Sequence, residues 1–112
     1  MLNNCLKNKI AFVKDLNVAV ANRVSGVESV DYVVFEDLDH GWYDEYLVVN
    51  YRGGAVQARN CAGNSNAAIL EELAKMVYSS QVYCGDTETY LSFVKRATGN
   101  PNCTAIFSSK NL

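Results

Sequence analysis

The sequence predicts an α+β fold in two layers: a three- or four-stranded, mainly antiparallel sheet, packed against an N-terminal helix and two later helices. The predicted order of elements is α-β-β-β-α-α, and a short strand after the last helix is an open alternative. Three observations predict this fold: a helical repeat over residues 3–24, two strand-like runs flanking Gly53-Gly54, and two further helical repeats after residue 65. A chain of 112 residues suits one domain over 1–112 and is too short for two cores.

The first helix is predicted from apolar residues that step by three or four along residues 3–24. Asn3 or Asn4 can cap its start, and Ser25-Gly26 supplies its end, because glycine tolerates the left-handed conformation that follows a helix. Its apolar stripe contains Leu6, Ile10, Val13, Leu16, Val20 and Val24.

The first strand is predicted over residues 30–38, which are rich in valine and aromatic residues. Its apolar residues fall on both alternating faces. This pattern indicates an inner strand, or one whose second face is also covered.

A β-hairpin is predicted from residues 45–52 and 55–61, which flank Gly53-Gly54. This pair suits a two-residue turn of type I′, which would pair Arg52 with Ala55. The resulting register separates apolar from polar side chains. It places one set against the helices: Leu47, Val49, Tyr51, Val56 and Ala58.

Two more helices are predicted after the hairpin. The second helix begins at Ser65 or Asn66 and runs to about residue 78, with Leu70, Leu73, Ala74 and Val77 as its apolar stripe. The third begins at Asp86 or Thr87 and runs to about residue 97, with Tyr90, Leu91 and Val94 facing the core. Residues 104–107 suit a last short strand, and residues 108–112 are expected to fray.

The four cysteines, Cys5, Cys61, Cys84 and Cys103, are spread singly along the chain. No apolar export segment precedes them, and no stretch approaches the roughly 18 apolar residues that a membrane helix needs. We therefore expect four reduced thiols in a cytoplasmic protein that does not contact a membrane.

The residue types that usually perform catalysis or bind metals and phosphates do not form a recognisable motif in this sequence. His40 is the single histidine, and it has no second histidine or cysteine at ligand spacing. The segment Gly63-Asn64-Ser65-Asn66 lacks the lysine and second glycine of a phosphate loop. We expect a protein that is not an enzyme, with no catalytic residue, metal site or cofactor.

Acidic charge is concentrated in the middle of the chain. The net charge is −2, yet no lysine or arginine lies between Arg23 and Arg52, where seven of the twelve acidic residues are found. Five of these acids lie in residues 36–46, together with Trp42, Tyr43 and Tyr46. Aromatic residues concentrate binding energy at interfaces, and acids steer a basic partner toward them. The predicted partner-binding residues are Glu36, Asp37, Asp39, Trp42, Tyr43, Asp44, Glu45 and Tyr46.

The sequence thus predicts a small protein-binding module. One form of this prediction is an acidic protein that inhibits or regulates a basic partner, such as a nucleic-acid enzyme. Its size and acidic-aromatic segment are of the kind seen in small bacterial and phage inhibitors that copy the charge of DNA.

Two other functions stay open at this point. One is a small enzyme or small-ligand sensor with its site on the second face of the sheet. The other is a nucleic-acid-associated protein that uses the basic first helix, although the acidic segment opposes direct binding to nucleic acid. A patch of Tyr32, Val34, Tyr46 and Val48 is expected either to form a homodimer or to lie beneath a helix.

Overall fold

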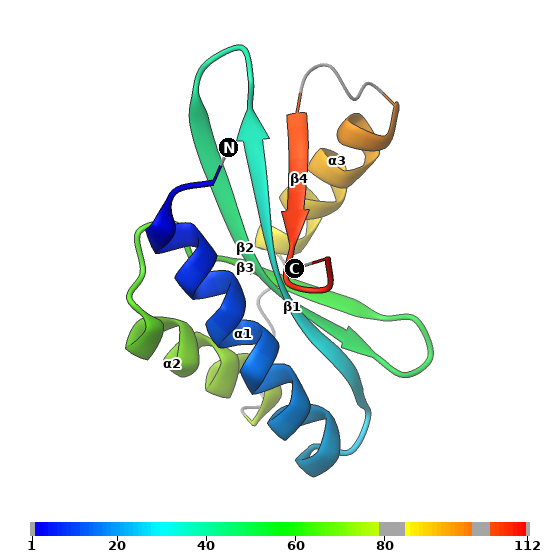
Figure 1. Cartoon of the computed structure of the whole chain (residues 1–112). Coiled ribbons are helices and arrows are strands. Elements are labelled where there is room, and N and C mark those ends of the chain that lie inside the picture. The colour runs from blue at the N-terminus through cyan, green and yellow to red at the C-terminus, as the bar shows by residue number, and fades with distance from the viewer. Residues whose placement is uncertain (1, 79–84, 100–103, 112) are drawn as a thin grey trace.

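The computed structural model describes residues 2–78, 85–99 and 104–111, which form three helices and four strands (Figure 1). The α+β class, the order of elements and the short final strand are confirmed. In chain order the elements are α1 (Asn4–Arg23), β1 (Val27–Asp37), β2 (Trp42–Tyr51), β3 (Val56–Asn60), α2 (Asn66–Val77), α3 (Gly85–Gly99) and β4 (Thr104–Ser108).

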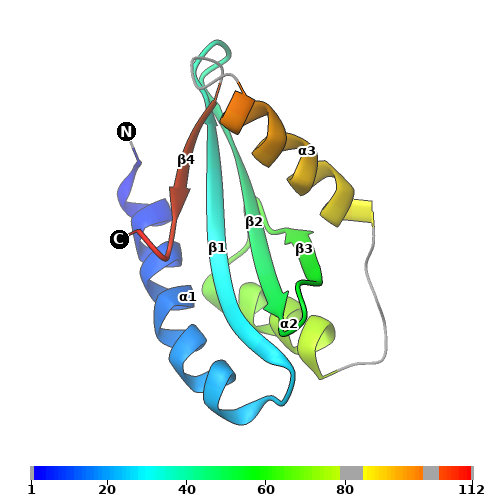
Figure 2. The ribbon, with the colours of Figure 1, turned by 90° about the vertical axis from the view of Figure 1, so that its right-hand side faces the viewer.

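The four strands form one antiparallel sheet in the order β3-β2-β1-β4. Helices α1 and α2 cover one face of this sheet, and α3 covers the other, so the molecule has three layers where two were expected (Figure 2). The physical reason lies in β1, whose apolar side chains point to both faces and need cover on each. The second face therefore holds a packed core of Val33, Phe35, Tyr46, Val48 and Ala58, covered by α3.

This second core bears on two expectations. On the second sheet face, where a ligand site is one of the open alternatives, described side chains of α3 pack directly against the strands. The expected patch of Tyr32, Val34, Tyr46 and Val48 is buried beneath helices, which is the second of its two predicted outcomes, but it is divided between opposite faces of the sheet. Tyr32 and Val34 are buried in the core beneath α1, whereas Tyr46 and Val48 are buried beneath α3. The two pairs point to opposite faces because Tyr32 is paired with Leu47 across the sheet.

The β2–β3 register differs from the expected one by one residue. The backbone amide of Tyr51 donates to the carbonyl of Ala55 over 2.8 Å, so the loop holds three residues and both of its glycines adopt positive φ. Val48 consequently pairs with Ala58, and the side chains of Val56 and Ala58 face α3. The expected orientation of Leu47, Val49 and Tyr51 toward α1 and α2 is confirmed.

The end of the chain is held more firmly than expected. Ser108 and Ser109 are both buried, and their hydroxyl groups donate to the carboxylate of Asp31. The amide of Ser109 also donates to the carbonyl of Tyr32 over 3.1 Å. These contacts extend the β1–β4 pairing, so the expected fraying is wrong for Ser108 and Ser109.

Two helical stripes also differ from the expectation. In α2 the buried side chains are Ile69, Leu73 and Met76, while Leu70 is 48% exposed. In α3 Leu91 is exposed, while Tyr90 and Val94 pack on the second core, as expected.

Cys5 and Cys61 are free thiols, and the expectation for Cys84 and Cys103 falls outside the described residues. Within the described ranges, no helix is both long and apolar enough to cross a bilayer.

Candidate binding surface at the β1–β2 hairpin

The turn between β1 and β2 is fixed by the side chain of Asp37. Its Oδ1 atom accepts hydrogen bonds from the amides of Asp39 and His40, at 3.0 and 3.1 Å. The carbonyl of Asp37 accepts from the amide of Gly41 over 2.8 Å, and Gly41 adopts a φ of 76° that favours glycine. The acidic segment is therefore a defined turn, and it lies at one end of the sheet (Figure 1).

Two rings are stacked at this turn. The centroids of the His40 and Trp42 rings lie 4.5 Å apart, with their planes 11° from parallel. The Nδ1 atom of His40 also lies 3.0 Å from Oδ2 of Asp37, which holds the imidazole against the indole. Trp42 nevertheless stays 54% exposed, as does Leu38 beside it in the turn. We call residues 37–44 the hairpin tip.

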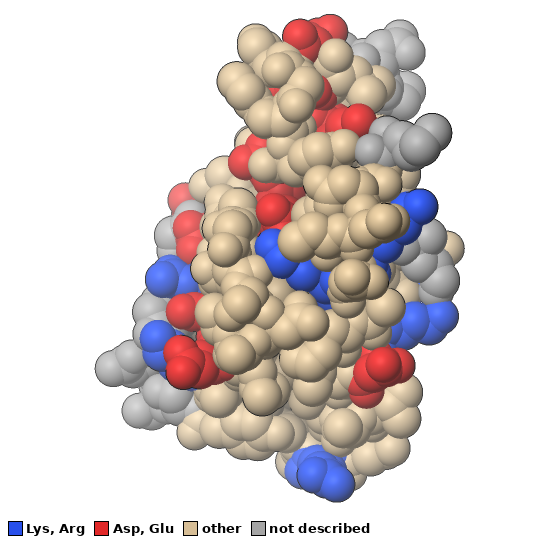
Figure 3. Space-filling model, turned by 60° about the vertical axis from the view of Figure 1, so that its left-hand side comes forward, with Lys and Arg blue, Asp and Glu red and all other residues tan. Residues whose placement is uncertain are grey.

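The carboxylates of the hairpin tip differ in their environments. Partial burial alone would raise the pKa of Asp37, but the hydrogen bonds from His40 and from the turn amides bring that pKa below its usual value. Burial raises the pKa of Asp44, and Asp37 raises it further, while Arg96 opposes both effects. Figure 3 shows acidic side chains around this projecting end of the molecule, with lysine and arginine side chains further from it.

Tyr43 and Glu36 form a cross-strand pair at the base of the hairpin tip, on the face that α1 covers. Burial raises the pKa of the Tyr43 hydroxyl, and the neighbouring Glu36 carboxylate raises it further. The Tyr43 ring packs against the first core, so it supports the turn from below.

Two of the expected binding residues are not accessible to a partner. The Tyr46 ring is buried in the second core, where its centroid lies 6.0 Å from that of Phe35 and 5.6 Å from that of Tyr90. Glu45 is buried on the opposite face, with its Oε1 atom 3.2 Å from Lys9 Nζ.

The remaining expected residues lie together at or beside the hairpin tip: Glu36, Asp37, Asp39, Trp42, Tyr43 and Asp44.

A buried polar cluster around Glu45 was not expected from the sequence. The hydroxyl of Tyr32 donates to Glu45 Oε1 over 2.8 Å, and Lys9 completes the cluster from α1. Burial raises the pKa of Tyr32, and the Glu45 carboxylate raises it further. The sequence contains one indication that Lys9 is buried: it lies three residues after Leu6, beside the apolar stripe of its helix.

His40 and Leu38 were also missed as members of the site. Both stand in the turn itself, where exposed side chains are common. In the described ranges 2–78, 85–99 and 104–111, no three histidine, cysteine or acidic side chains are grouped to hold a metal ion. Comparison with family models, curated proteins and solved structures finds no match to this chain.

Proposed function

We propose that the chain is a protein-binding module without catalytic activity, and that the hairpin tip is its contact surface. The observation that carries this proposal is the position of Trp42. Its large ring is half-exposed, yet it is held in one orientation by the stack on His40. An exposed aromatic ring held in place is well suited to bind a partner, because little conformational entropy is lost when it enters a pocket.

The charges of the hairpin tip favour a basic partner. Asp39 and Asp44 precede and follow Trp42 in the chain and add negative charge to the tip, and Glu36 stands next to the turn. Summed over the tip, these charges would steer a positively charged surface toward Trp42 during encounter. Basic surfaces are characteristic of nucleic-acid enzymes, so we infer a cytoplasmic inhibitor or regulator of such an enzyme as the best-supported form.

Site-specific cross-linking tests this proposal in cells that naturally express the chain. A photoreactive phenylalanine analogue would replace Trp42 in one variant and Arg52 in a control. Arg52 is exposed in the β2–β3 turn, near the other end of β2. We expect one basic protein to be captured from position 42 and not from position 52.

The captured protein should then bind the purified chain more slowly as salt concentration rises. Equal capture from both positions, or an absence of capture from position 42, contradicts the proposal.

A further inference from the structure

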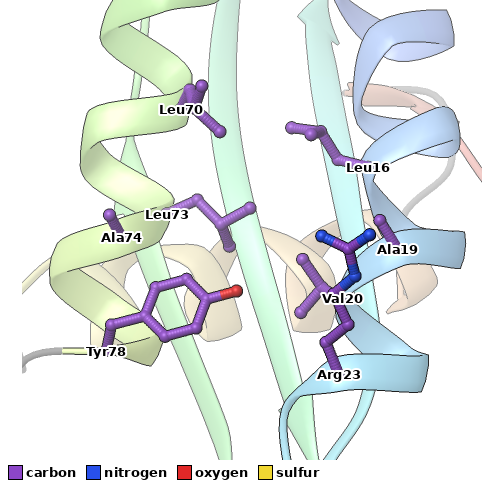
Figure 4. A pocket seen from close by; sticks show the side chains of 8 residues that line it. All are labelled: Leu16, Ala19, Val20, Arg23, Leu70, Leu73, Ala74 and Tyr78. Atoms are coloured by element: carbon purple, nitrogen blue, oxygen red, sulfur yellow. The ribbon is translucent and has the colours of Figure 1, made fainter.

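A groove runs between α1 and α2, on the surface away from the sheet (Figure 4). It encloses a pocket of about 180 Å³. Three apolar residues of each helix line it, together with Arg23 of α1 and Tyr78, which caps the C-terminus of α2. The lining residues are Leu16, Ala19, Val20, Arg23, Leu70, Leu73, Ala74 and Tyr78.

The groove exists because α2 carries more apolar surface than the sheet covers. Ile69, Leu73 and Met76 of α2 are buried in the first core. Leu70, Ala74 and Tyr78 follow one another at intervals of four residues and form a second, outward stripe, in which Leu70 and Tyr78 are 48% and 64% exposed. A helix that only covered a sheet would carry polar side chains at such positions. The second stripe instead faces the pocket.

Two polar groups lie at one end of this apolar pocket. The Tyr78 ring extends from the residue that caps α2, with its hydroxyl pointing across the groove toward α1 (Figure 4). The Arg23 guanidinium extends from the last turn of α1 into the same space. A mostly apolar pocket with a few convergent polar groups is the usual form of a small-molecule site.

We propose that this pocket binds an amphipathic organic anion, with a hydrocarbon body about the size of one aromatic ring and a single carboxylate. The size follows from the volume, since a cavity of about 150 Å³ lined by apolar residues holds benzene. The charge follows from Arg23, which is the single charged residue among the eight described residues of the lining.

The geometry of the polar groups favours a carboxylate as the anionic group. A guanidinium matches the two oxygens of a carboxylate, and the Tyr78 hydroxyl supplies a further donor. This site is separate from the hairpin tip, and the inference does not depend on the proposed function.

Phenylacetate is a suitable probe, and phenylacetamide is its neutral counterpart of nearly the same shape. Each would be titrated into the full-length, isotopically labelled chain while backbone amide NMR shifts are followed. For a ligand of this size we expect phenylacetate to bind with a dissociation constant on the order of 1 mM. The largest shifts should fall on residues 16–23 and 70–78, and phenylacetamide should bind about tenfold more weakly.

Three variants separate the roles of charge and shape. Arg23→Gln should weaken phenylacetate binding about tenfold and leave phenylacetamide binding unchanged. Lys7→Gln is the matched control, because Lys7 is an exposed cation of the same helix about 24 Å away along its axis. Ala74→Phe should abolish binding of both probes by filling the pocket, without changing the melting temperature much, because position 74 is exposed.

Several results would overturn the inference. Equal affinity for phenylacetate and phenylacetamide would show that Arg23 does not select the anion. Shifts centred outside residues 16–23 and 70–78, or normal binding by Ala74→Phe, would place the ligand elsewhere. A titration that does not approach saturation by roughly 20 mM phenylacetate would rule the site out at this ligand size.

Discussion

His40 and Trp42 lie face to face across the β1–β2 turn, with ring centroids 4.5 Å apart, while the Asp37 carboxylate contacts the Nδ1 atom of the imidazole. This arrangement keeps an indole ring at the surface without leaving it free to rotate. The ring is therefore prepared for binding before a partner arrives. Trp42 is also the single tryptophan of the chain, so tryptophan fluorescence reports on this ring alone.

Tryptophan fluorescence should report an exposed ring in the free protein. Because Trp42 is 54% exposed, we expect emission at long wavelength and quenching by acrylamide at about half the efficiency seen in the urea-unfolded chain. His40→Ala should increase the quenching by removing the stacked neighbour. A short-wavelength maximum that resists acrylamide would place the ring in a core and contradict this structure of the tip.

Removal of charge near the tip should slow association with the basic partner. The test variant carries Glu36→Gln, Asp39→Asn and Asp44→Asn, and retains Asp37 because its side chain holds the turn. We expect the association rate at low salt to fall about tenfold, with a smaller change in the dissociation rate. Stopped-flow mixing at several salt concentrations measures both effects.

The control for this variant removes the same number of charges from exposed positions elsewhere: Asp15→Asn, Glu28→Gln and Glu71→Gln. If the control slows association as much as the tip variant does, net charge alone explains the effect and the tip has no special role.

The buried pair of Lys9 and Glu45 should matter for stability. Lys9→Met leaves the Glu45 carboxylate buried without its cation, so we expect a loss of about 3 kcal/mol in the free energy of unfolding. Lys75→Met is the matched control, because the Lys75 side chain is exposed in its ion pair with Glu72. This pair should contribute less than about 1 kcal/mol to the free energy of unfolding. Urea unfolding measures both, and equal losses would contradict a role for the buried pair.

Stability should fall in alkaline solution, with Cys61 as one cause. Burial raises the pKa of the Cys61 thiol from its usual 9.0 to about 11. Between these values the unfolded chain releases a proton that the folded chain retains, so the free energy of unfolding decreases as pH rises from 9 to 11. Tyr46, whose pKa burial raises to about 12 from 10.0, extends the same decline at higher pH.

Cys61→Ala removes the first of these two groups. The variant should show a shallower loss of stability than the parent protein in urea unfolding between pH 9 and 10.5, whatever its stability at pH 7. An identical slope in both proteins would show that the Cys61 thiol ionises alike in the folded and unfolded chains.

Local signals predicted the elements well. Asn3 caps α1, with its side chain accepting from the amide of Leu6 over 2.9 Å, and Ser65 caps α2 in the same way. The mixed apolar faces of residues 30–38 correctly indicated an inner strand. The β2–β3 register was missed because two adjacent glycines permit both a two-residue and a three-residue loop, and a shift by one residue turns every side chain of β3 to the other face.

The candidate site was predicted in part. Composition alone identified the acidic-aromatic segment. It could not distinguish the residues of the hairpin tip from the buried residues of the strand that supports it. Strand alternation places Glu45 on the face of Leu47 and Tyr46 on the opposite face, so both are buried. The partner of Glu45 is Lys9, which lies 36 residues earlier, and no local pattern connects the two.

Binding kinetics of Trp42→Ala with the partner captured by cross-linking decide whether the hairpin tip is the binding surface. If the ring fills a partner pocket, its removal costs about 2 kcal/mol of binding free energy, so we expect the dissociation rate to rise about 30-fold. The association rate and the melting temperature should change little, because Trp42 lies outside both cores. An unchanged dissociation rate together with a sharply lower melting temperature would make Trp42 a structural residue and contradict the hairpin tip as the binding surface.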